Sequence, residues 1–261
     1  DPKSGKKYVH TINPINGKSQ ETNVLSASVI SESCFTADAF ATAMMVSDID
    51  NAIKKHLTKK FDQFVAVNDL SFSVREGEVL GFLGPNGAGK STTMKVITGF
   101  LSPSSGRVTI DGHDISTAAL EAKRLIGYLP EGAPSYGDMT TLEFLRFIAQ
   151  VRGFRGVEID QKVDQVINEV ALQTVRDQSI ETLSKGFKRR VGLAQAIMHD
   201  PKVLILDEPT DGLDPNQKHH VRALIKNLAT DKIVIISTHI LEEVTAVCSR
   251  AVIIANGKIV A

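Results

Sequence analysis

The chain has 261 residues, of which 42% are hydrophobic and 23% are charged, as is typical of a globular protein. Because 30 basic residues balance 30 acidic ones, the overall charge does not indicate a polyanionic partner, and we expect no nucleic acid. With only two cysteines the chain cannot form a disulfide framework, which favours a reducing compartment. The sequence shows neither a signal peptide nor an apolar run of about 18 residues, so it predicts neither export nor a membrane span. The chain starts at Asp1 rather than Met and ends in a strand-like run, which predicts a sequence cut at both ends.

The first segment, residues 1–57, differs in pattern from the rest of the chain. Residues 24–31 read as a strand, and residues 36–56 read as a helix that Thr36 can cap. No linker rich in Gly, Pro or Ser follows it. We therefore predict a short α+β fragment over residues 1–57, directly followed by a main domain over residues 58–261.

The main domain alternates short β-branched runs with stretches of helical periodicity. Several runs are continuously apolar, as expected for strands that are buried on both faces of a sheet. Alternating strands and helices favour an α/β fold with a largely parallel sheet. Residues 140–202 show helical patterns without a strand and predict a helical subdomain. The predicted strands are 65–74, 78–84, 106–110, 125–130, 203–209, 233–237 and 251–257, and the predicted helices include 142–154, 163–172 and 189–199.

A glycine-rich loop lies between a predicted strand and the helix that begins at Lys90. Gly84 and Gly89–Lys90–Ser91 fit the pattern G-x-x-x-x-G-K-[ST], which binds nucleotide phosphates in this context. Backbone N–H groups can surround phosphate oxygens only where no Cβ intervenes, and the helix N-terminus adds positive potential. Lys90 is expected to contact the outer phosphates, and the Ser91 hydroxyl to ligate Mg²⁺. The expected nucleotide-binding residues of this loop are Gly84, Pro85, Asn86, Gly87, Ala88, Gly89, Lys90, Ser91 and Thr92.

Two acidic residues stand at the end of the apolar run 203–209. Carboxylates at the end of a buried strand are costly unless they have a specific role. We expect Asp207 to hold Mg²⁺ through water. We expect Glu208 to polarise the attacking water, as a general base or as the group that orients it.

From about residue 57 to Ala261, this combination resembles the nucleotide-binding domain of ABC transporters, which has the P-loop NTPase fold. Residues 183–190, LSKGFKRR, resemble the family's signature, and residues 212–215 read GLDP. The signature usually reads Leu-Ser-Gly-Gly-Gln, so this chain departs from it while keeping Ser184 and Gly186. The resemblance implies that these two residues meet the γ-phosphate of a nucleotide bound to a second subunit.

Three single residues follow from the same resemblance. Phe61 stands where the family keeps an aromatic residue that stacks on adenine. His239, in the run STHI, corresponds to the γ-phosphate sensor. Glu131 stands where the family usually has glutamine, and can still accept a hydrogen bond from a metal-bound water.

The resemblance implies an ATP-binding and ATP-hydrolysing subunit that uses Mg²⁺, with Lys90, Glu208 and His239 as its catalytic residues. It also implies a two-fold dimer formed on ATP and a multi-span membrane subunit, which would place the chain in the cytoplasm at the inner face of the cell membrane. The alternative within the family is an ABC ATPase that does not serve a transporter. Export, rather than import, is the direction that the departures favour.

The N-terminal segment resembles the C-terminal part of the FAD:protein FMN transferase family. The matches are His10, Asn13, Pro14 and Gly17, followed by Asp38 and Thr42. At a spacing of four, the last two share a helix face, and the resemblance implies that they ligate Mg²⁺. Because the rest of that family's domain is missing, we expect a vestigial site and regard flavin transfer as an alternative function only. The first strand usual for an ABC ATPase is not recognisable after this segment.

Overall fold

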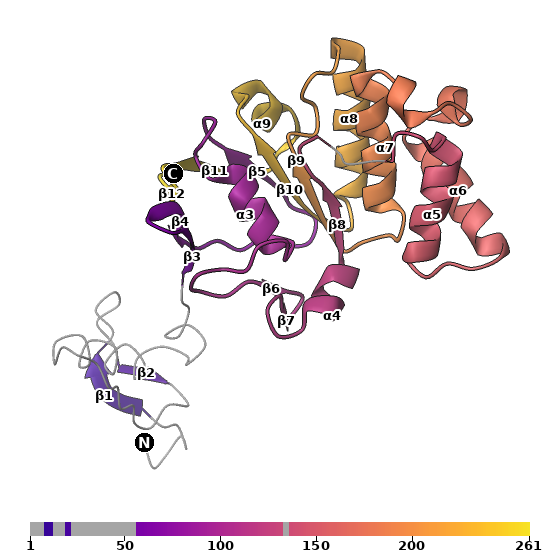
Figure 1. Cartoon of the computed structure of the whole chain (residues 1–261). Coiled ribbons are helices and arrows are strands. Elements are labelled where there is room, and N and C mark those ends of the chain that lie inside the picture. The colour runs from indigo at the N-terminus through magenta and orange to yellow at the C-terminus, as the bar shows by residue number, and fades with distance from the viewer. Residues whose placement is uncertain (1–7, 13–18, 22–55, 133–135) are drawn as a thin grey trace. The chain divides into compact units, whose positions relative to one another are not determined.

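The computed structural model describes residues 8–12, 19–21, 56–132 and 136–261 (Figure 1). The chain divides into two compact units, Asp1–Lys55 and His56–Ala261. In the first unit, β1 (Tyr8–Ile12) pairs antiparallel with β2 (Ser19–Glu21). The strand predicted at 24–31 and nearly all of the helix predicted at 36–56 lie outside the described residues.

A six-stranded sheet forms the centre of the second unit, in the order β12-β11-β5-β10-β9-β8. All neighbouring strands run parallel except the first pair, in which β12 lies antiparallel to β11. The predicted α/β fold with a largely parallel sheet is therefore confirmed. The strands are β5 (Val79–Leu83), β8 (Ile126–Leu129), β9 (Val203–Asp207), β10 (Ile233–Thr238), β11 (Arg250–Ala255) and β12 (Lys258–Ile259).

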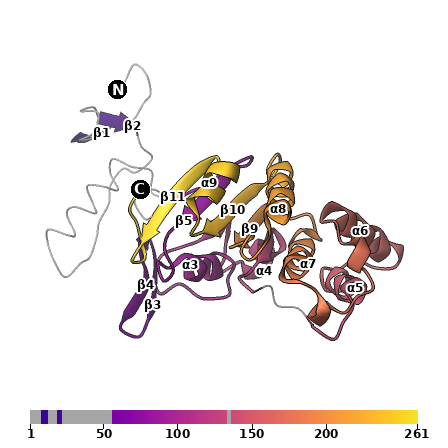
Figure 2. The same cartoon turned by 90° about the horizontal axis from the view of Figure 1, so that it is seen from above.

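Helices cover both faces of this sheet, as the two views in Figures 1 and 2 show. Alternate strand residues point to opposite faces. Leu80 and Phe82 therefore pack in one core with α3 (Lys90–Ile97), while Val79 packs in a second core with α8 (Pro215–Leu228) and α9 (Leu241–Val247). Burial on both faces explains why the central strands are continuously apolar.

The predicted helical subdomain extends from the second core. It contains α5 (Thr141–Val151), α6 (Val157–Glu169) and α7 (Lys185–Ile197), with two short 3₁₀ helices, η1 (Gln173–Val175) and η2 (Ile180–Thr182). Helix α5 begins with a capping box, in which the Thr140 side chain accepts from the backbone N–H of Glu143 and the Glu143 carboxylate accepts from that of Thr140. Helix α7 packs against β8, at the edge of the sheet.

Two predicted strands lie outside the sheet and are shorter than expected. The strand predicted at 65–74 ends at Leu70 as β4 (Phe64–Leu70), which pairs with β3 (Leu57–Phe61). β3, the first strand of the second unit, is not recognisable from the sequence pattern. The strand predicted at 106–110 is reduced to β6 (Thr109–Ile110), which pairs with β7 (His113–Asp114) before α4 (Ala119–Arg124). The intervening turn, Asp111–Gly112, has positive φ at both residues, as two-residue hairpins favour.

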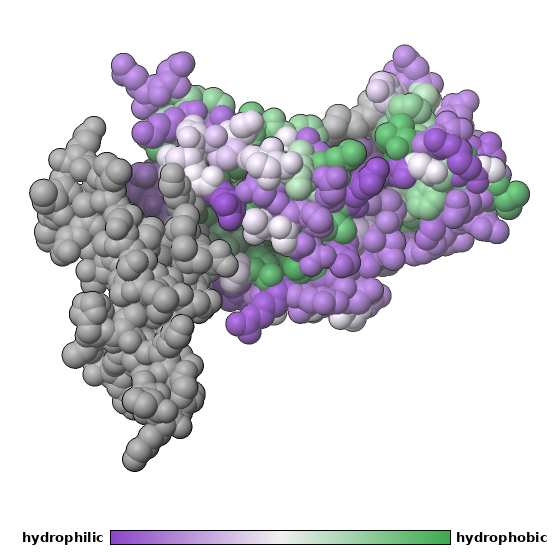
Figure 3. All heavy atoms as spheres, turned by 90° about the horizontal axis from the view of Figure 1, so that it is seen from below, coloured by the Kyte–Doolittle hydropathy of each residue, from purple (hydrophilic) through white to green (hydrophobic). Residues whose placement is uncertain are grey.

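The surface of the described residues is mostly hydrophilic when seen from below (Figure 3). Apolar side chains appear on this face in separate patches rather than in one continuous area.

Candidate nucleotide site

The glycine-rich loop connects β5 to α3, as predicted. Gly89 caps α3 in the left-handed region, with φ of 100°, and the first turn of the helix contains no acidic residue. The N-terminal N–H groups of α3 are therefore available to an anion. A Cβ on Gly89 would lie 2.4 Å from the carbonyl oxygen of Ala66, in β4, and one on Gly84 would lie 2.4 Å from that of Ile254. These two glycines thus also allow close packing of the loop against its supporting strands.

Lys90 is buried at the start of α3, with 6% of its surface exposed. Its Nζ donates to the carbonyl oxygens of Gly84, at 2.8 Å, and Pro85, at 3.3 Å. It also lies 3.6 Å from Oε1 of Glu208. The ammonium group is therefore held beneath the loop, where phosphate oxygens would meet the backbone N–H groups.

Asp207 and Ser91 form the side of the site that suits a metal ion. The Ser91 hydroxyl donates to Oδ1 of Asp207 at 3.3 Å, and the Ser237 hydroxyl donates to the same oxygen. Asp207 is fully buried, and within the described part of the chain its Oδ2 has no hydrogen-bond partner. One hydroxyl and one carboxylate oxygen with spare capacity fit Mg²⁺, which commonly takes few protein ligands beside phosphates and waters.

Glu208 lies one residue beyond β9, between Lys90 and His239. Nδ1 of His239 is 3.1 Å from each carboxylate oxygen of Glu208. The side chain of Glu208 is 11% exposed and that of His239 is 40% exposed, so the pair lies at the mouth of the site. A carboxylate held beside an imidazole and an ammonium group is suited to orienting a water molecule.

The remaining residues expected at the nucleotide lie at the borders of the site. Phe61 is 43% exposed at the end of β3, with the Lys59 ammonium 5.0 Å from its ring centre. Its partner strand β4 contacts the loop through Ala66. Glu131 is exposed just beyond β8, the strand next to β9. In the described residues, neither Phe61 nor Glu131 forms a hydrogen bond with Ser91 or Asp207, and their roles stay predictions.

The signature residues lie elsewhere in the same unit. Ser184 is exposed and caps α7, where its hydroxyl accepts from the N–H of Phe187 at 3.4 Å. Helix α7, which belongs to the helical subdomain, lies apart from α3 in both views (Figures 1 and 2). A Cβ on Gly186 would lie 2.0 Å from Oε1 of Gln217, so this glycine accommodates the start of α8. Within the described residues, no hydrogen bond connects Ser184 with the loop.

The ligands predicted in the first unit cannot be placed. His10 lies in β1. Asn13, Pro14, Gly17, Asp38 and Thr42 lie outside the described residues. In the part of the chain that the structure describes, no cluster of three or more His, Cys, Asp or Glu side chains could hold a metal ion.

Three residues that sequence reasoning missed support the site. Arg189, in α7, donates to the backbone carbonyls of both Asp207 and Glu208. Ser237 shares Oδ1 of Asp207 with Ser91. Gly257 donates from its N–H to the carbonyl oxygen of Ala88 at 3.0 Å. The Asn-Gly pair at 256–257 is a hairpin signal, but its position against the loop depends on the strand order.

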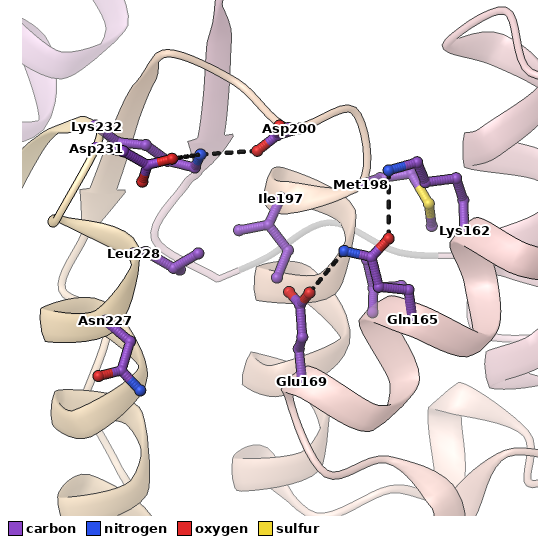
Figure 4. A pocket seen from close by; sticks show the side chains of 11 residues that line it. Lys162, Gln165, Glu169, Ile197, Met198, Asp200, Asn227, Leu228, Asp231 and Lys232 are labelled. Carbon is purple, nitrogen blue, oxygen red and sulfur yellow. Dashed lines mark hydrogen bonds and ion pairs between the residues drawn. The ribbon is translucent and has the colours of Figure 1, made fainter.

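A pocket of about 190 Å³ lies at the other end of α7, between α6 and the end of α8 (Figure 4). Its charged groups pair with one another. Lys232 lies 2.7 Å from Asp200 and 3.3 Å from Asp231, while Gln165 bridges Lys162 and Glu169. None of the predicted site residues lines this pocket.

The geometry of the loop and the acidic strand end agrees with comparisons to known proteins. A model of the ABC transporter family matches residues 67–211, more than half of the chain. The chain belongs to the ABC transporter family. A model of the ApbE family matches residues 1–65, which confirms the flavin-transferase resemblance of the N-terminal segment. Both predicted resemblances are thus correct.

Several ABC proteins are similar over the second unit. The chain is 36% identical over 211 residues to the probable multidrug ABC transporter ATP-binding protein YbhF of Escherichia coli (strain K12), covering 79% of this chain and 36% of YbhF. It is 40% identical over 208 residues to the uncharacterized ABC transporter ATP-binding protein YhcH of Bacillus subtilis (strain 168), covering 79% of this chain and 67% of YhcH. The chain thus spans about a third of the length of YbhF and two thirds of YhcH.

Solved ABC structures share the fold of this ABC domain. One described as the ATP binding subunit of an ABC transporter superposes with a TM-score of 0.72 at 31% identity. The match covers 79% of this chain and 87% of that one.

Proposed function

We propose that this chain is an ATP-hydrolysing subunit of an ABC transporter, which dimerises on ATP and drives transport through a membrane subunit. The observation that carries the proposal is the convergence of Lys90, Asp207 and Glu208 around the N-terminus of α3. The similarity to YhcH and to an ATP binding subunit of known structure supports it.

In this proposal the loop and α3 bind the phosphates of ATP. Lys90 exchanges its carbonyl partners in the loop for phosphate oxygens, to which it makes charge-assisted hydrogen bonds. The Ser91 hydroxyl and Asp207 would hold the Mg²⁺ that accompanies the nucleotide and neutralises phosphate charge. Phe61 would stack on adenine, and Glu131 would accept from a water on the metal.

The proposed chemistry uses the carboxylate of Glu208. It orients the attacking water and accepts its proton as the new bond to the γ-phosphorus forms and the bond to the β–γ bridging oxygen breaks, which releases ADP. His239, 3.1 Å from the same carboxylate, fixes its direction and contacts the γ-phosphate. The Lys90 ammonium stabilises the negative charge that develops on the phosphate oxygens in the transition state.

The position of Ser184 supports a dimer of two copies. Ser184 caps α7 and Gly186 lies in its first turn, and Figure 1 shows α7 apart from α3, the helix that follows the loop. In the proposed dimer they meet the γ-phosphate held by the other copy, so that a two-fold axis completes two sites.

The experiment is Glu208→Gln, followed by size-exclusion chromatography with light scattering. The variant should bind ATP, lose turnover and elute as a dimer in Mg-ATP, because glutamine removes the base but leaves the phosphate contacts. Wild type should return to monomer as ATP is consumed. A variant that stays monomeric in saturating Mg-ATP, or that hydrolyses at the wild-type rate, contradicts the proposal.

The membrane subunit is part of the same proposal. No helix in the described part of the chain has the length and apolarity to cross a membrane. A separate multi-span subunit would hold this chain at the cytoplasmic face of the cell membrane. Copurification with such a subunit, when the neighbouring genes are expressed together, would support the proposal, and an ATPase active only without one would favour a non-transport ABC protein.

Flavin transfer is a second candidate, supported by the ApbE match to residues 1–65. It predicts FAD bound to the purified chain. The match ends before the glycine-rich loop begins, and the first unit, Asp1–Lys55, contains none of the residues expected at the nucleotide. We therefore propose that this unit takes no part in ATP hydrolysis. Titration of the purified chain with FAD, followed by flavin fluorescence, tests this candidate directly.

A further inference from the structure

Arg189 is a buried cation that the proposed mechanism does not use. It lies in the second turn of α7 with 8% of its surface exposed. Its Nη1 donates to the carbonyl oxygen of Pro130 at 3.0 Å, and its Nη2 donates to the carbonyl oxygens of both Asp207 and Glu208. One side chain of the signature helix therefore contacts the ends of both β8 and β9.

The contact with two successive carbonyls is unusual for residues at the end of a strand. In a regular strand, neighbouring carbonyls point to opposite sides. Glu208 has φ of 50°, in the left-handed region that residues with a Cβ avoid. This conformation brings the carbonyl oxygens of Asp207 and Glu208 to the same nitrogen of Arg189.

The strand pairing leaves room for this contact. β8 ends at Leu129, which is paired with Leu206, so pairing on that side stops one residue before Asp207. On the other side, the N–H of Glu208 still donates to the carbonyl oxygen of Ser237 at 3.1 Å. The turn is thus held on one side by β10 and on the other by the guanidinium group.

We propose that Arg189 is a positioning residue, which fixes the left-handed turn at Glu208 and so directs its carboxylate toward Lys90 and His239. Because Arg189 lies five residues after Ser184, this contact also connects the end of α7 that meets the second copy with the residue that orients water. The inference rests on the proposed roles of Glu208 and Ser184. The competing explanation is that Arg189 only caps the strand ends and stabilises the fold.

The test uses the full chain with Arg189→Met, which removes the donors at similar length. Loss of position at Glu208 should lower turnover at least tenfold, while the Kd for Mg-ATP stays within about twofold. The variant should also accumulate as a dimer in Mg-ATP, as Glu208→Gln should, because nucleotide still binds and hydrolysis is slow. A purely structural role predicts no such gain of dimer.

Two further variants make the test decisive. Arg190→Met is the matched control and should keep turnover, because the Arg190 guanidinium stacks on Phe187 and donates to the carbonyl oxygen of Ala171 at 3.4 Å instead of to the strand ends. Arg189→Lys keeps the positive charge but has fewer hydrogen-bond donors, so it should recover part of the turnover. If the Met variant does not fold, the Lys variant replaces it in the test.

The proposal is overturned if Arg189→Met or Arg189→Lys hydrolyses at the wild-type rate. It is also overturned if a folded variant, by circular dichroism and melting, loses turnover and dimer together. If Glu208→Gln itself stays active or monomeric, the proposed function fails instead, and the two failures are distinguished.

Discussion

Lys90 and Glu208 face each other across the site, with Nζ and Oε1 3.6 Å apart and both side chains largely buried. The ammonium group is held at the same time by the carbonyl oxygens of Gly84 and Pro85. Each of these partners is an acceptor that phosphate oxygens can replace. When a nucleotide binds, the Lys90 ammonium group therefore exchanges these acceptors for phosphate oxygens and does not have to move in from solvent.

Substitution of Lys90 by alanine should weaken ATP binding. Charge-assisted hydrogen bonds contribute about 1.5–3 kcal/mol each, so the Kd should rise by about tenfold to about a hundredfold. Fluorescent-nucleotide titration measures the change. Lys95→Ala, at an exposed position in the same helix, is the control and should leave the Kd unchanged. Wild-type affinity in Lys90→Ala would remove the role given to this lysine.

Gly84, in the loop, and Gly186, in the signature, should respond differently to alanine. The new Cβ of Gly84→Ala would press on the backbone of Ile254, which cannot move freely, so the free energy of unfolding should fall by about 1–3 kcal/mol. The Cβ of Gly186→Ala would meet only the end of the flexible Gln217 side chain, so the loss should stay within about 1 kcal/mol. Urea denaturation compares the two, and equal losses would contradict this explanation.

Glu243 should matter much more for stability than its neighbour Glu242. The Glu243 side chain is 4% exposed, accepts from Thr210 and lies 3.3 Å from both Lys218 and Arg222. Removing it leaves the partly buried Lys218 without its carboxylate and takes from Arg222 one of its two, so Glu243→Ala should lower the free energy of unfolding by about 2 kcal/mol. Glu242, 77% exposed, should cost under about 0.5 kcal/mol as Glu242→Ala. Thermal and urea denaturation of the two variants provide the measurement.

The stability of the protein should fall at mildly acidic pH because of His199. Burial lowers the pKa of His199 to about 4, from an ordinary value of 6.5, and the nearby Arg152 adds to the effect. The unfolded chain therefore binds a proton that the folded chain does not, and the free energy of unfolding should decrease as pH falls from about 6.5 to about 4. Its Nε2 donates to the carbonyl oxygen of Ile126 at 3.1 Å, a bond that glutamine can replace.

Urea denaturation between pH 4 and pH 7 tests this expectation. His199→Gln should show a smaller decrease than wild type over that range. His220→Gln, on an exposed part of α8, should keep the wild-type slope. Identical slopes for wild type and His199→Gln would contradict the assignment.

The sequence predicted the parts of the site that local chemistry determines. The loop from Gly84 to Thr92 and the acids Asp207 and Glu208 follow apolar runs, and buried parallel strands place such ends at one edge of a sheet. The ABC resemblance added His239, which the structure places against Glu208. The position of Phe61 and Glu131 relative to a nucleotide stays a prediction.

The missed parts depend on contacts between distant segments. In the sequence, Arg189 is one of three consecutive basic residues, and nothing there predicts that it is buried. Its burial follows from the structure, because β8 ends at Leu129, one residue before it could pair with Asp207, and the guanidinium group occupies that position. The run 65–74 reads as one strand of the main sheet, whereas β4 pairs with β3 instead. The sequence does not predict β3, because only one residue of LTKKF, Leu57, is buried and the two lysines make the segment look like a solvated charge run.

The β3–β4 hairpin crosses the point where the two family matches meet. The ApbE match extends to residue 65 and the ABC match begins at residue 67, yet β3 belongs to the ATPase unit by burial of Leu57 and by the bond from the Thr58 N–H to Ser105. A recombination event, or a designed domain exchange, that joined the families at this point would cut β4 after its first residues and separate β3 from most of its partner strand. Family similarity therefore divides the chain inside β4, whereas the pairing of β3 with β4 keeps the whole hairpin in the unit that begins at His56.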